Sequence, residues 1–234
     1  SEDEIYLDAI VRETATAGSF RESSSALDGF DGLSQADRSK ADMMRSRADR
    51  IMGSHKSFES YLEAKFEQHI VAAESYLRQG KYHRAADSFA LASIYKMVPR
   101  EAGSEPVRAF GLALSLAGRS HALFAAGEYI SSALFLTRAL EADPEYARAE
   151  IVDFVTMLGG ADKLERRIAD VKEWLERSGA GELQFLLGYV YYRMGKLQEA
   201  KEAIDAACEK MPQSPAVDAV RKAIDDAMKS PVRS

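Results

Sequence analysis

One spacing constrains the fold of this chain more than any other feature. Four positions recur 68 residues apart, which is two steps of 34, and the pairs are Gly127 and Gly195, Tyr129 and Leu197, Ala139 and Ala207, and Pro144 and Pro212. An earlier copy begins at Gly80, 47 residues before Gly127, which is 34 plus an insertion of 13. A period of 34 is typical of arrays of helix-turn-helix units, so the sequence predicts an all-α solenoid.

Glycine and proline residues divide the chain after residue 56 into helices. We expect helices over residues 57–79, 83–97, 105–126, 129–142, 144–158, 162–178, 181–194 and 197–210, and a last helix from Pro215. They form four helical pairs over residues 57–214, followed by a capping helix and tail over residues 215–234. The turn of the third pair, at Gly159, is displaced by two residues from the 34-residue spacing.

The first 56 residues lie outside the repeat pattern. Residues 1–33 form a Ser/Gly-rich arm, and the pairs Asp28-Gly29 and Asp31-Gly32 are turn signals. Residues 34–56 carry an amphipathic helix, which we expect to pack on the first repeat. We also expect the arm to lie along the solenoid of its own chain or of a neighbouring chain.

The segment from Glu182 to Pro212 resembles a tetratricopeptide repeat. The residues that carry the resemblance are small, aromatic or turn-forming, namely Gly188, Tyr191, Gly195, Ala200, Ile204, Ala207 and Pro212. The copies at residues 80–92 and 127–144 are similar to it, and the second departs from the family pattern at Ser120 and Ser132. The resemblance extends over about residues 57–229.

The resemblance implies a right-handed superhelix in which the first helix of each pair lines a concave groove. It further implies a non-catalytic scaffold that binds a protein or peptide partner and needs no cofactor. One subclass of the family grips a partner's terminal carboxylate with Lys, Asn and Arg on these helices. The matching positions here are Ile70, Glu74, Leu114 and Gly118, so that clamp is absent.

We expect nine residues on the first helices of the pairs to line the partner-binding groove. They are Ile70, Glu74, Leu77, His121, Phe124, Phe185, Tyr189, Tyr192 and Arg193. Aromatic residues and arginine are enriched in interface hot spots. We therefore expect at least two of Phe124, Tyr189 and Tyr192 to be exposed.

The remaining composition favours an interaction protein over other classes. Four histidines and a single cysteine do not have zinc-binding spacing, and no catalytic or metal-binding set is apparent. The net charge of −6 argues against a nucleic-acid partner, and the apolar stretches are too short for membrane insertion. The alternatives are a self-assembling module that uses the arm or an open end of the solenoid, and an accessory domain of an enzyme. The sequence leaves the compartment open, cytoplasmic or extracytoplasmic.

Overall fold

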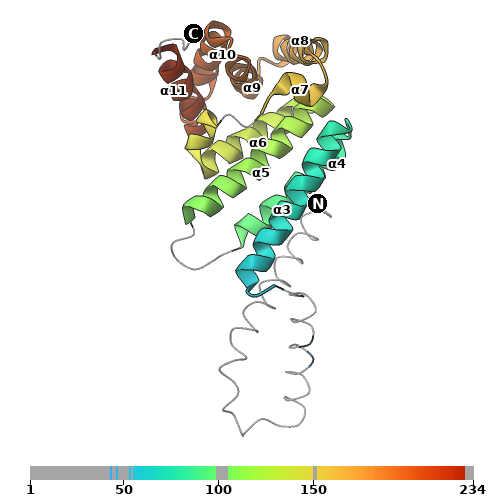
Figure 1. Ribbon diagram of the computed structural model, residues 1–234. Helices are drawn as coiled ribbons and strands as arrows, with labels where there is room; N and C mark the ends of the chain where they lie inside the picture. Colours follow the sequence, from blue (N-terminus) through green and yellow to red (C-terminus); the bar gives the residue numbers. More distant parts are fainter. Residues whose placement is uncertain are drawn as a thin grey trace.

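A computed structural model describes residues 43, 46, 53, 55–98, 105–149 and 152–229 (Figure 1). All regular secondary structure in this part of the chain is helical. The predictions for the arm of residues 1–33, and nearly all of those for residues 34–56, fall outside the described residues.

The helices begin and end close to the residues where glycine and proline predicted them. They are α3 (Phe58–Arg78), α4 (Tyr82–Met97), α5 (Glu105–Ala126), α6 (Tyr129–Ala142), the 3-10 helix η1 (Pro144–Arg148), α7 (Phe154–Leu158), α8 (Ala161–Ser178), α9 (Gly181–Arg193), α10 (Leu197–Lys210) and α11 (Pro215–Lys229). The all-α helical-repeat architecture is confirmed.

The turns and the close helix contacts depend on small residues at the repeated positions. Gly80 and Gly195 have φ of +69° and +72°, in the left-handed region that glycine adopts without strain. A Cβ on Gly188 of α9 would lie only 3.1 Å from the backbone nitrogen of Ile204 in α10. Glycine at this position therefore lets α9 and α10 approach closely.

The first two pairs form a regular stack. In chain order, α3 packs on α4, α4 on α5 and α5 on α6 (Figure 1). The core between them includes Leu62 and Leu136, both fully buried, and small residues such as Ala92 and Ala117. This stack places α3 and α5, the first helices of two successive pairs, on the same side of the array.

The third unit differs from the prediction, because residues 144–158 do not form one helix. The described residues form the 3-10 helix η1, then residues 149, 152 and 153 outside any helix, and then the five-residue helix α7. The Asp143 carboxylate accepts a hydrogen bond from the Glu145 amide, and that of Asp153 accepts from the amides of Val155 and Thr156. Asp153 thus starts a second helix inside the predicted one.

The irregular third unit packs less extensively than the regular pairs. α8 contacts both α7 and α9, while α9 also packs directly against α6 of the second pair. The regular, closely packed pairs of the described residues are therefore α3–α4, α5–α6 and α9–α10.

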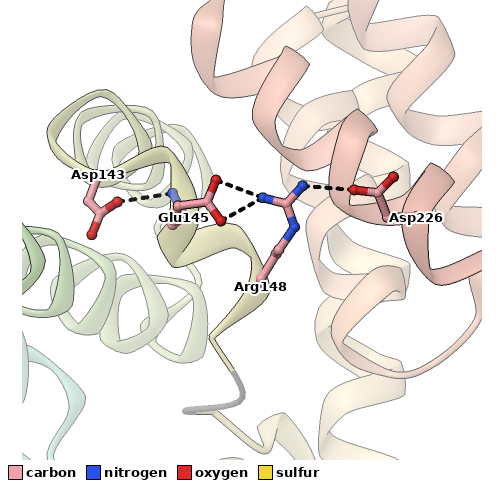
Figure 2. A network of polar contacts seen from close by, with 4 residues as sticks. All are labelled: Asp143, Glu145, Arg148 and Asp226. Atoms are coloured by element: carbon pink, nitrogen blue, oxygen red, sulfur yellow. Dashed lines mark hydrogen bonds and ion pairs between the residues drawn. The ribbon is translucent and has the colours of Figure 1, made fainter.

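The last helix, α11, joins the end of the array to its middle. Its apolar face, including Val217, Val220 and Ile224, is buried against α10, α6, η1 and α9. At the edge of this contact, the Arg148 guanidinium of η1 donates to the carboxylates of Glu145 and Asp226, each at 2.8 Å (Figure 2). Because these ionic groups are partly exposed, the apolar contacts hold α11 more strongly than the ion pairs.

Candidate binding groove

A groove of about 790 Å³ lies between α3, α5 and α7. One wall comes from α3, the second from α5, and the third from α7 and the residue before it. Among its lining residues are Ile70, Glu74, Leu77, Leu114, Gly118, His121, Asp153, Thr156 and Met157.

The two helical walls present residues at the same helical spacing. Ile70, Glu74 and Leu77 follow one another at steps of four and three along α3, and Leu114, Gly118 and His121 do the same along α5. Residues at this spacing share one face of a helix. Four of the nine predicted groove residues, namely Ile70, Glu74, Leu77 and His121, therefore lie on the lining of this groove.

The third wall was not predicted, because it depends on the break before α7. The Asp153 carboxylate accepts a hydrogen bond from the Thr156 hydroxyl at 2.6 Å, besides those from the backbone amides. The hydroxyl and the two amides hold the pKa of Asp153 below its usual value. The sequence signal for this wall was Asp153, an N-cap residue six positions before the helix break at Gly159.

Phe154 of α7 is the centre of an aromatic cluster beneath the groove. Its ring lies edge-on to His121, Phe124 and Tyr189, with ring centroids 5.2, 5.3 and 6.3 Å apart respectively. Phe154 is only 3% exposed. The cluster joins α5, α7 and α9 through direct side-chain contacts.

This cluster corrects the predicted exposure of the groove aromatics. Phe124 and Tyr189 are each 1% exposed and Phe185 is fully buried, so the expectation that at least two of Phe124, Tyr189 and Tyr192 are exposed is wrong. The prediction rested on the helical register of a regular array. Phe154, which comes from the irregular third unit, covers Phe124 and Tyr189.

His121 lies at the boundary between the groove and the cluster. Its Nε2 is 3.1 Å from the hydroxyl of Tyr189, and the two rings stack with centroids 5.7 Å apart. Burial, with a smaller contribution from the charge of Arg193, lowers the pKa of His121 to about 3. Burial also raises the pKa of Tyr189 to about 12, so the pair is neutral at pH 7.

Tyr192 and Arg193 lie on α9 and are partly buried. The Arg193 guanidinium lies over the Tyr189 ring, 5.9 Å from its centroid. Neither residue lines the groove between α3, α5 and α7. Their predicted contact with a partner stays a prediction.

Metal binding, thiol reactivity and membrane insertion were considered for the part of the chain that the structure describes. Within it, no group of three or more His, Cys, Asp or Glu side chains is placed to hold a metal ion. Desolvation raises the pKa of the Cys208 thiol. None of the described helices combines the length and the apolar character that a membrane span requires.

Comparison with known families gives a match over one segment of the chain. Residues 181–214, which contain α9, α10 and the turn that follows, match the family described as Tetratricopeptide repeat. The chain therefore contains a tetratricopeptide repeat, and such repeats are typical protein–protein interaction modules. No significant match is found among curated proteins or solved structures.

Proposed function

We propose that this protein is a non-catalytic scaffold that binds a peptide or a segment of a partner protein in the groove between α3, α5 and α7. The observation that carries the proposal is the position of the groove. It lies along the first helices of two successive pairs, the surface that the family resemblance assigns to partner binding. The tetratricopeptide repeat at residues 181–214 supports an interaction role for the array.

The composition of the groove suits a peptide. Ile70, Leu77, Leu114 and Met157 are partly buried and supply an apolar floor, on which partner side chains can bury apolar surface. Polar residues at the rim, including Thr156, remain exposed and can form hydrogen bonds with a peptide backbone.

The titratable groups at the groove support binding rather than catalysis. The His121 ring is neutral at pH 7 and pairs with Tyr189, and the Asp153 carboxylate caps α7. Each of these groups already has a structural partner.

The test is to select peptides from a random displayed library on the full chain and to measure their dissociation constants. The groove variant is Met157→Glu, and the control is Leu134→Glu, at a leucine of α6 that is 46% exposed. We expect Met157→Glu to weaken binding about tenfold or more, because a carboxylate replaces an apolar contact. We expect Leu134→Glu to change it less than about twofold. Equal effects of the two variants, with both folded by circular dichroism, would overturn the proposal.

A further inference from the structure

One end of the groove continues into a cleft between the α3–α4 turn and α8. Gly80, Tyr82 and Lys163 line the groove and also take part in two neighbouring hollows of about 600 and 400 Å³. Tyr82 lines all three. In Figure 1, α8 lies above the turn that joins α3 to α4. A segment bound in the groove can therefore extend into this cleft.

Basic side chains gather at the cleft. The cleft is lined by five basic residues, and we call it the basic cleft. The residues are Lys81, Arg84, Lys163, Arg166 and Arg167. They come from two separate parts of the chain, the start of α4 with the turn before it and the first two turns of α8. This concentration of positive charge contrasts with the net charge of −6 for the whole chain.

Nearby carboxylates neutralise little of this charge. Asp170 forms an ion pair with Arg167 at 3.5 Å and accepts a hydrogen bond from the Tyr129 hydroxyl at 2.9 Å. Glu128, at the edge, lies 3.3 Å from His83.

The other four basic residues keep their charge available. Lys81 donates to the Gln79 side chain, and the Arg84 guanidinium lies over the Tyr76 ring. Within the described part of the chain, Lys81, Arg84, Lys163 and Arg166 form no ion pair, and all four are exposed.

From this arrangement we propose that the partner segment carries a run of Asp or Glu residues next to its apolar residues. The apolar residues occupy the groove, and the acidic run enters the basic cleft. This inference rests on the proposed function. It adds the chemical class of the partner segment and states which part of that segment lies in the groove and which part lies in the cleft. Complementary charge of this kind speeds association and fixes the register of a bound segment.

The basic cleft differs from the carboxylate clamp that the sequence lacks. The clamp positions Ile70, Glu74, Leu114 and Gly118 line the groove itself and carry no positive charge. The basic residues come from the turn before α4, from the first turn of α4, and from α8 of the irregular third unit.

An acidic peptide fits this surface better than a nucleic acid does. A nucleic acid needs a basic track along its backbone and aromatic faces for its bases. The cleft is short, its described lining has only the rings of Tyr82 and His83, which are adjacent in the sequence, and the acidic chain as a whole repels a long polyanion.

The test uses Trp174, the single tryptophan of the chain. It is 52% exposed and lies 7 residues after Arg167 and 11 after Lys163, on the same face of α8. A peptide selected on the wild-type chain is added in steps to the protein, and the fluorescence of Trp174 is recorded. The same peptide with Asp and Glu replaced by Asn and Gln is titrated in parallel.

We expect the selected peptides to contain an acidic run at one end, and its neutralisation to weaken binding at least tenfold at low salt. Added salt reduces this difference by screening. In the variant Lys163→Glu with Arg166→Glu, the acidic peptide and its neutralised form should bind with equal affinity. The control Lys196→Glu with Lys222→Glu makes the same change in net charge at exposed lysines outside the groove and the cleft. In this control the difference in affinity between the two peptides should persist.

Several results overturn the inference. One is the selection of peptides without acidic runs that still depend on Met157, which leaves the proposed function standing. Another is an equal effect of the two charge variants, and a third is equally tight binding of polyuridylate. Recovery of no binding peptide at all would overturn this inference and the proposed function together.

Discussion

Single residues set how closely the helices of this array approach. Gly118 of α5 lies against the ring of Phe89 in α4, so closely that an added Cβ would overlap three ring carbons. Phe89 is itself only 4% exposed and has little room to move. Because Gly118 also lines the groove, the small residue serves both the packing of α4 on α5 and the depth of the groove.

We expect Gly118→Ala to lower the free energy of unfolding. Overpacking costs roughly 1–3 kcal/mol, which outweighs the gain of about 1 kcal/mol in helix propensity. Ala207→Leu, at a fully buried position of α10, should cost a similar amount for the same reason. Urea unfolding measures both. A variant more stable than the wild type would show that the neighbouring side chain moves without cost.

His121 gives the array a predictable response to acid. Its pKa is about 3 in the folded chain, against about 6.5 when unfolded, so the unfolded chain binds the proton more readily. The contribution of neutral His121 to stability is complete above pH 6.5 and is lost as the pH falls toward 3. The slope approaches one proton, about 1.4 kcal/mol per pH unit.

The measurement is urea unfolding of the wild type and of His121→Phe between pH 7 and pH 5. Phenylalanine keeps an aromatic ring in the cluster but cannot take up a proton. We expect the stability of the variant to fall less steeply with acid than that of the wild type. Parallel curves for the two proteins would contradict the buried, neutral state of His121.

At the scale of the element, the sequence predicted regular helices well and the irregular unit poorly. The turns lie at the repeated Gly80, Gly127 and Gly195, because each of these glycines adopts a positive φ that ends the preceding helix. The predicted helix over residues 144–158 failed because the side chains of Asp143 and Asp153 each cap a separate helix. For the same reason, register alone identified the walls from α3 and α5 but not the α7 wall or the burial of Tyr189.

The anchor of α7 is Phe154. We expect Phe154→Ala to reduce the free energy of unfolding by about 3–5 kcal/mol, because it leaves a cavity among His121, Phe124 and Tyr189. The neighbouring Val155 is 38% exposed, so Val155→Ala should cost about 0.5 kcal/mol or less. Thermal or urea unfolding compares the pair. Similar losses for both variants would mean that α7 is not held by its phenylalanine.

For the molecule as a whole, α11 adds contacts between units that are not adjacent in the array. Repeat arrays are held mainly by contacts between adjacent units. Here α11 contacts α6 and η1 as well as α9 and α10, so it ties the last unit to the second. Ile224 lies in this contact and is fully buried, whereas Met228 on the same helix is 46% exposed.

We expect Ile224→Ala to cost roughly 2–5 kcal/mol and Met228→Ala to cost little. Because α11 couples the units, the loss should appear both in the helical circular dichroism and in the fluorescence of Trp174 on α8. The two signals should keep a common midpoint. Separate midpoints in the wild type would show that the units unfold independently.

The central claim is that a peptide binds between α3, α5 and α7, and amide hydrogen exchange with a selected peptide tests it most directly. We expect peptide binding to slow exchange in residues 70–80, 111–121 and 153–163, and to leave α10 unchanged. Protection confined to α9 and α10, or no protection in any of the three segments, would contradict the claim.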